Sequence, residues 1–165
     1  MKKNILIGVI CALVAFGMTS CEKTKTKTEL LTEKSWSLTK ATSTPAYELE
    51  AGVNITDLFD GFIRDYELDD LLRFDVNGGV FLNPGKVRDE GQAAGEELLG
   101  KWSFDENTDK LDFYLPYYED AVVGTVTVLN ETTLTVGVKI NEDDGEGDIA
   151  KAVRSYDFVL SYTKK

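Results

Sequence analysis

The side chains with the most capacity for chemistry in this chain are carboxylates. The run NEDDGEGD, residues 141–148, crowds them around two glycines. Calcium takes six to eight oxygen ligands and often binds in loops of this kind. The spacing departs from the helix–loop–helix calcium motif, because Gly145 comes early and no closing glutamate follows. A hairpin loop that its charges keep soluble therefore remains the alternative to a calcium site. The calcium ligands would be Asp143, Asp144, Glu146 and Asp148.

Histidine is absent from the 165 residues, and this absence excludes several kinds of active site. They are Ser–His–Asp catalysis, zinc or iron held by imidazole, and imidazole acid–base catalysis. The adjacent acids Asp69 and Asp70 could join a third carboxylate in glycoside hydrolysis, but we interpret them as a solvated turn before a strand. No glycine-rich phosphate loop follows a predicted strand. The sequence thus predicts a protein that is not an enzyme and that uses no cofactor, the calcium alternative apart.

Aromatic side chains give the better lead to function. The stretch FYLPYYED places Tyr114, Tyr117 and Tyr118 at the end of a predicted strand and in the loop that follows. At an open barrel mouth, such side chains would offer flat faces and hydroxyl groups to a ligand. We therefore take these tyrosines, with Trp36 and Phe113, as candidate ligand-binding residues. The alternative is that the aromatic residues simply fill the interior or decorate the rim.

The chain contains two cysteines, Cys11 and Cys21, and the second has a distinctive setting. Lys2 and Lys3 precede the apolar run 5–16, and the small-residue exit Met-Thr-Ser follows it, as in a secretory signal. The run is too short for a membrane-spanning helix. Residues 1–20 resemble a bacterial lipoprotein signal, which implies cleavage before Cys21 and fatty acyl chains on that cysteine. Two or three such chains would hold the protein firmly at a membrane.

Charge divides the remainder of the chain. The formal net charge is −11, and it becomes −13 once Lys2 and Lys3 leave with the signal. Residues 22–34 carry four lysines and three glutamates, and their Thr-rich composition predicts a flexible tether of roughly 20 Å. The strongly acidic remainder lacks the basic stripe that nucleic-acid binding requires. We expect three segments: the signal 1–20, the lipidated cysteine with its tether 21–34, and one folded domain 35–165.

The folded domain shows the two-residue period of antiparallel β-structure. LTVGVKI places Leu134, Val136, Val138 and Ile140 on one face, and YDFVLSY (156–162) alternates in the same way. The turn sequences VNGG (76–79) and NET (130–132) separate neighbouring runs. Short connections between successive strands favour an eight-stranded up-and-down barrel, which has no exposed edges. The predicted strands are 35–42, 70–76, 79–83, 100–105, 110–115, 121–130, 133–140 and 150–163.

One segment departs from the strand period. TDLFDGFIRDYELDD, residues 56–70, places Leu58, Phe59, Phe62 and Ile63 on one helical stripe after the N-cap candidate Thr56. This pattern predicts a short helix over about 57–65. In a barrel, such a helix could cover one opening.

Several motifs together resemble the lipocalin-like domains of secreted bacterial lipoproteins. They are the Trp36 strand, the stretch TDLF…ELDDLLRFDVNGGVFLNPG, GKWSFDENTDKLDF, VTVLNETTLTV and the final YDFVLSY. The resemblance covers nearly the whole chain after the signal and implies an all-β barrel. Many relatives carry two cysteines near the helix and in the loop before Gly-x-Trp; this chain has none there, so we expect the loop 84–99 to be looser. The resemblance carries no residue-level site to this chain.

These observations lead to a ranked set of functions. The first is a lipid-anchored protein of the bacterial cell envelope, held in the outer membrane and facing the periplasm or the cell surface. Its barrel would bind a small apolar or amphipathic molecule or a glycan fragment. The second is an interaction module with a filled barrel that contacts another envelope protein. The third is a calcium-dependent surface protein. A continuous interior cavity favours the first function, and a filled interior favours the second.

Overall fold

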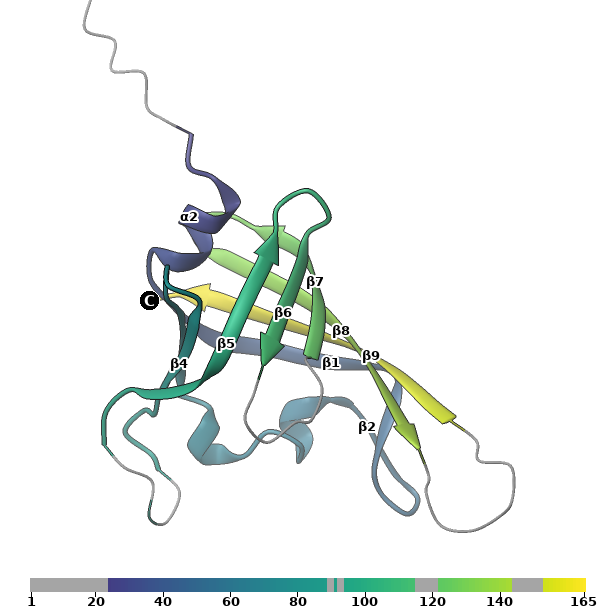
Figure 1. The fold of residues 1–165 in the computed structure, drawn as a ribbon. Coiled ribbons are helices and arrows are strands. Elements are labelled where there is room, and N and C mark those ends of the chain that lie inside the picture. The colour runs from purple at the N-terminus through teal and green to yellow at the C-terminus, as the bar shows by residue number, and fades with distance from the viewer. Residues whose placement is uncertain (1–23, 89–90, 92–93, 115–121, 144–152) are drawn as a thin grey trace, which may run out of the picture.

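The computed structural model shows a closed barrel of eight antiparallel strands with one short α-helix (Figure 1). It describes residues 24–88, 91, 94–114, 122–143 and 153–165. Each strand pairs with its neighbour in sequence, and pairing between the first strand and the last closes the ring. The all-β barrel predicted from the alternating pattern is thus confirmed. The barrel strands are β1 (Ser35–Glu50), β3 (Leu71–Phe74), β4 (Gly79–Asn83), β5 (Glu97–Asp105), β6 (Lys110–Tyr114), β7 (Val122–Leu129), β8 (Thr133–Asp143) and β9 (Val153–Lys164).

Strand β1 is longer than predicted because its second half serves a different partner. Its first residues pair with β3, and β9 runs beside it from Trp36 to Thr44. The last part pairs with a ninth strand, β2 (Val53–Asp57), through a hairpin that turns at 51–52. The β1–β9 register shifts between Leu38 and Lys40. Such a bulge changes which residues face inward, so Trp36 and then Ala41 and Ser43 are buried.

The predicted helix over 57–65 is wrong. The segment instead ends β2 and then forms two 3₁₀ turns, η1 (Leu58–Asp60) and η2 (Asp65–Glu67). Asp57 caps η1 by accepting a hydrogen bond from the Phe59 N–H at 3.1 Å. Gly61 then adopts a φ of 137°, outside the helical range, and stops the turn. The apolar stripe still serves packing, since Leu58 is 1% exposed.

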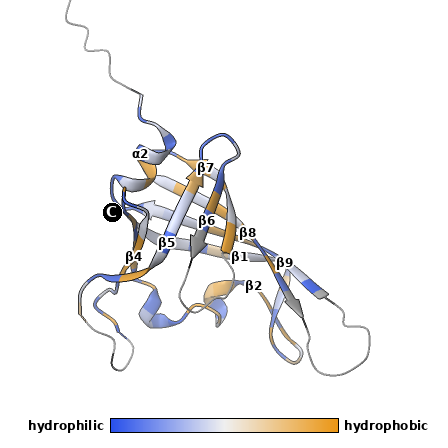
Figure 2. Cartoon of the chain, in the orientation of Figure 1, coloured by the Kyte–Doolittle hydropathy of each residue, from blue (hydrophilic) through white to orange (hydrophobic). Residues whose placement is uncertain are grey.

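The core follows the predicted alternation. Leu134, Val136 and Val138 of β8 point inward, as do Tyr156 and Phe158 of β9. Figure 2 shows hydrophobic residues distributed over the barrel strands and a strongly hydrophilic turn between β5 and β6. The largest fully buried side chains are Trp36, Phe74, Leu31, Leu58, Leu111, Leu134, Val80 and Val136.

A helix that the sequence did not predict, α2 (Lys27–Thr32), covers one end of the barrel (Figure 1). Thr26 and Glu29 form a reciprocal capping box at its start. Leu31 is fully buried, and its carbonyl accepts a hydrogen bond from the Trp36 indole N–H at 2.9 Å. The interpretation of 22–34 as a flexible tether is therefore wrong for Thr26–Thr32, which belong to the fold.

Polar contacts attach α2 to the turns at the same end of the barrel. Lys27 Nζ lies 2.6 Å from Asp109 Oδ1 in the β5–β6 turn. The Thr28 N–H donates to Glu106 Oε1 at 2.9 Å. Glu33 accepts hydrogen bonds from Lys164 at 2.6 Å and from Lys25 at 2.9 Å. The helix α2 covers this end, whereas the η1–η2 segment lies toward the opposite end (Figure 1). No helix in the described part of the chain is long and apolar enough to cross a membrane.

Candidate functional site

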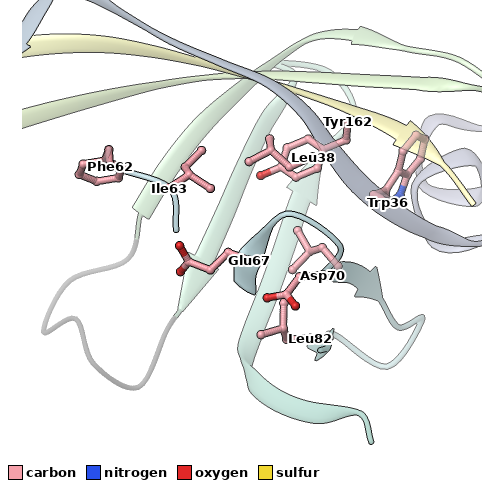
Figure 3. Close-up of a pocket in the computed structure, with 9 residues that line it drawn as sticks. Trp36, Leu38, Phe62, Ile63, Glu67, Asp70, Leu82 and Tyr162 are labelled. Carbon is pink, nitrogen blue, oxygen red and sulfur yellow. The ribbon is translucent and has the colours of Figure 1, made fainter. Parts of the chain in front are cut away.

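A cavity of about 240 Å³ opens inside the barrel between the Trp36 ring and the η1–η2 segment (Figure 3). It lies on one side of Trp36, whose other side is covered by α2. Its position shows that the interior is filled near α2 and unfilled toward the opposite end. The lining residues are Trp36, Leu38, Phe62, Ile63, Glu67, Asp70, Leu72, Leu82 and Tyr162.

The apolar wall of the cavity follows from strand register. Trp36 pairs with Leu72 across β1 and β3, and Leu72 pairs with Leu82 across β3 and β4. Side chains that are opposite one another in paired strands lie on the same face of the sheet. Leu38 and Tyr162 form the corresponding pair across β1 and β9. The alternating pattern of four strands therefore builds one continuous apolar surface inside the barrel.

The segment between η1 and η2 forms the lid of the cavity. Phe62 and Ile63 line it, and their backbone N–H groups both bond to the Leu58 carbonyl, at 3.0 and 2.8 Å. The Phe62 ring makes edge-to-face contacts with Tyr47 and Phe158, with centroid distances of 5.2 and 5.8 Å. Phe62 is nevertheless 44% exposed, so one side of its ring borders solvent.

Two carboxylates, Glu67 and Asp70, line the otherwise apolar cavity. In Figure 3 they lie below the wall formed by Leu38, Ile63 and Tyr162. Glu67 Oε2 accepts a hydrogen bond from the Arg64 N–H at 2.7 Å, and Asp70 Oδ1 accepts one from the Gly85 N–H at 3.1 Å. Partial burial raises the pKa of Asp70 above its usual value, opposed by the Gly85 hydrogen bond and assisted by the nearby charges of Asp69 and Glu67.

The hydroxyl of Tyr162 points into the cavity from the side opposite the two carboxylates (Figure 3). Burial of the phenol raises the pKa of Tyr162 to about 12, because the charged form is poorly solvated there. Among the residues that the structure describes, none donates to or accepts from this hydroxyl. A buried tyrosine hydroxyl usually has a hydrogen-bond partner, so this group is available to a ligand.

A second hollow adjoins the cavity at the lid. Its volume is about 1020 Å³, and it shares Phe62 and Glu67 with the inner cavity. The Arg64 guanidinium donates to the Tyr66 hydroxyl at 2.6 Å, which fixes two polar side chains along this hollow. Its lining residues are Tyr47, Leu49, Gly61, Phe62, Arg64, Tyr66 and Glu67. Phe62 and Glu67 thus separate an inner apolar space from an outer polar one.

The acids Asp69 and Asp70 also have a structural role that the sequence did not predict. Asp69 Oδ2 accepts from the Lys86 N–H at 2.6 Å, next to the Asp70–Gly85 hydrogen bond. Together the two carboxylates hold the start of the β4–β5 connection against the end of η2. A Cβ atom at Gly85 would overlap the Asp69 carboxylate as it is placed here, so glycine allows this close approach.

The structure locates only part of the predicted ligand-binding set. Trp36 lines the cavity, and its role in ligand binding stays a prediction. Phe113 and Tyr114 are the last residues of β6, but their side chains, like all of Tyr117 and Tyr118, lie outside the described part of the chain. The sequence analysis did not identify Glu67, Asp70 or Tyr162 as site residues. The sequence nonetheless placed Tyr162 in an alternating strand pattern, and it placed Phe62 and Ile63 on an apolar stripe. These two patterns were the sequence features that could have identified them as cavity residues.

The remaining predicted sites lie mostly beyond the described residues. Cys21 precedes them, and so the proposed lipidation remains a prediction. Asp143 ends β8, whereas Asp144, Glu146 and Asp148 fall in the gap before β9. Within the described ranges, the acidic side chains form no group that could hold a metal ion. The calcium alternative therefore also stays a prediction.

No model of a protein family matches the chain, and no curated protein matches it. The resemblance to lipocalin-like lipoproteins consequently stays an expectation from sequence motifs.

Proposed function

We propose that this chain is a lipid-anchored protein of the bacterial cell envelope whose barrel binds a small amphipathic molecule. The cavity that lies between Trp36 and the lid is the observation that carries this proposal. Ligand sites are concave, largely apolar and supplied with a few polar groups that orient the ligand. Of the described residues that line the cavity, seven have apolar or aromatic side chains and two have carboxylates. The cavity therefore combines a largely apolar lining with a few polar groups.

The unfilled volume is significant because protein interiors are normally close-packed, with few voids larger than a water molecule. Here the half of the barrel near α2 obeys this rule, since Phe74, Leu111 and Leu134 are fully buried. The other half leaves about 240 Å³, room for about eight water-sized groups. Small-molecule sites usually range from about 300 Å³ upward, so the ligand that fits inside is small or extends into the outer hollow.

The position of α2 sets the orientation of such a protein at a membrane. Cys21 precedes the N-cap Thr26 by only five residues, which can span at most about 17 Å when fully extended. An acylated Cys21 would therefore hold the α2 end close to the lipid surface. The cavity lies toward the opposite end of the barrel and would face away from the membrane. We infer that the ligand enters from the aqueous side.

Native mass spectrometry of the protein purified from its host tests this function. The proposal predicts a retained molecule of small mass that is lost when Leu82→Trp fills the cavity. The matched control Leu98→Trp changes an exposed position on β5 and should keep the molecule. Recovery of the wild-type protein with no bound small molecule, together with failure of short amphiphiles to bind it in solution, would contradict the proposal.

A further inference from the structure

We propose that the cavity selects ligands whose polar head is a cationic amine, an inference that rests on the proposed function. The relevant observation is the composition of the polar part of the cavity. Among the described residues that line it, the charged ones are both acids, Glu67 and Asp70, and none is a lysine or arginine. A ligand with an apolar body would thus present its head group to two carboxylates.

Each carboxylate retains an oxygen for a ligand. Glu67 uses Oε2 for the Arg64 N–H, and Asp70 uses Oδ1 for the Gly85 N–H. Glu67 Oε1 and Asp70 Oδ2 receive no hydrogen bond from any residue that the structure describes. Both bonded donors are neutral backbone N–H groups, so they leave the negative charges of the two side chains uncompensated. A cation from outside would supply the missing compensation.

The Tyr162 hydroxyl completes the arrangement. It lies across the cavity from the two carboxylates and has no partner among the described residues (Figure 3). A primary ammonium group has three N–H donors and no acceptor. The described lining residues offer acceptors for such donors: an oxygen of each carboxylate and the Tyr162 oxygen. Hydrogen bonds between charged partners are stronger than neutral ones.

The same charges exclude the opposite class of ligand. A fatty acid in this cavity would place its carboxylate beside Glu67 and Asp70, with no cationic side chain among the lining residues to pair with it. The positive side chain of Arg64 lies along the outer hollow and donates to Tyr66. Like-charge contacts are a common means of rejecting a wrong ligand. The formal net charge of −11 would further attract cations and repel anions.

Three probes of equal chain length test this inference: octylamine, octanol and octanoate, each titrated calorimetrically into the full chain at pH 7. Octylamine should bind at least about tenfold more tightly than octanol, and octanoate more weakly than octanol. The variant Glu67→Gln/Asp70→Asn should bring octylamine and octanol to within about threefold of each other. The matched control Asp65→Asn, which removes an acid of η2 that does not line the cavity, should keep the preference.

Ionic strength gives a second readout that needs no variant. Salt screens partly exposed charges, so 1 M KCl should reduce the preference of the wild-type chain for octylamine over octanol. Octanoate binding as tightly as octylamine, or a preference unchanged both by salt and by Glu67→Gln/Asp70→Asn, would overturn the inference. If octanol still bound while the preference for the amine failed, only the inference about cationic ligands would be rejected and the proposed ligand-binding function would remain. If none of the three probes bound, the proposed function would fail as well.

Discussion

Removing the Leu31 side chain tests whether α2 is part of the folded domain. Leu31 is fully buried against the barrel, and truncation of a buried leucine to alanine costs about 2–5 kcal/mol. With a cost of about 3 kcal/mol, and an unfolding entropy of about 0.3 kcal/mol/K for a folded unit of this size, the melting temperature of Leu31→Ala should fall by about 10 °C. The Leu31 carbonyl still accepts the Trp36 indole N–H, so the loss measures packing.

Differential scanning calorimetry of the wild-type chain, Leu31→Ala and Leu30→Ala measures this effect. Leu30 is only half-buried, and its truncation should lower the melting temperature by less than half as much. A flexible tether would instead leave both variants with the wild-type melting temperature. Equal melting temperatures for wild type and Leu31→Ala would refute the reasoning that the fold begins at Thr26.

Three further predictions follow from the lid and the charges. Phe62→Ala should weaken octanol binding about tenfold, since part of a phenylalanine contact is lost, whereas Leu68→Ala, exposed and outside the cavity lining, should not. Hydrogen bonds from Lys164 and Lys25 lower the pKa of Glu33 to about 2 from its usual 4.5. The stabilisation that these bonds give is present above pH 4.5 and is lost as pH falls toward 2. The urea midpoint of Glu33→Gln should therefore vary less between pH 4.5 and pH 2 than the midpoint of the wild type. Because burial raises the pKa of Asp70, its ionised form opposes folding; Asp70→Asn should raise the melting temperature at pH 7, and the gain should vanish at low pH once wild-type Asp70 is protonated.

The strands were predictable because alternation is a local property that the barrel preserves. Leu134, Val136 and Val138 face inward as their spacing requires, and the Gly-containing turn at 76–79 leads from β3 into β4 as expected. Closure was predictable from short connections between successive strands. The alternation and the turns depend on residues that are near one another in the sequence.

The exceptions depend on longer-range contacts. The capping box of Thr26 and Glu29 was a readable helix signal, but a six-residue helix is unstable alone. It is held by Leu31 in the core and by Lys27 and its partner Asp109. The segment 56–70 carried a helical stripe, yet pairing with β1 and the conformation of Gly61 gave the end of a strand and short 3₁₀ turns instead.

The candidate site was less predictable than the fold. Trp36 was named as a candidate and lines the cavity, but the carboxylates of Glu67 and Asp70 reach it only because of where η2 lies. A sequence pattern identifies which side chains face inward without specifying how much space they leave. Whether large inward residues fill a barrel or line a cavity depends on strand register and on the position of the lid.

The most direct test of a ligand-binding barrel uses its two tryptophans as internal probes. Trp36 lines the cavity, whereas the Trp102 indole donates to the Asp75 carbonyl at 3.0 Å, away from the cavity lining. In a nuclear magnetic resonance titration with octanol, the Trp36 indole signal, assigned with Trp102→Phe, should shift and saturate while the Trp102 signal stays fixed. An unmoved Trp36 signal at saturating octanol would contradict binding in this cavity.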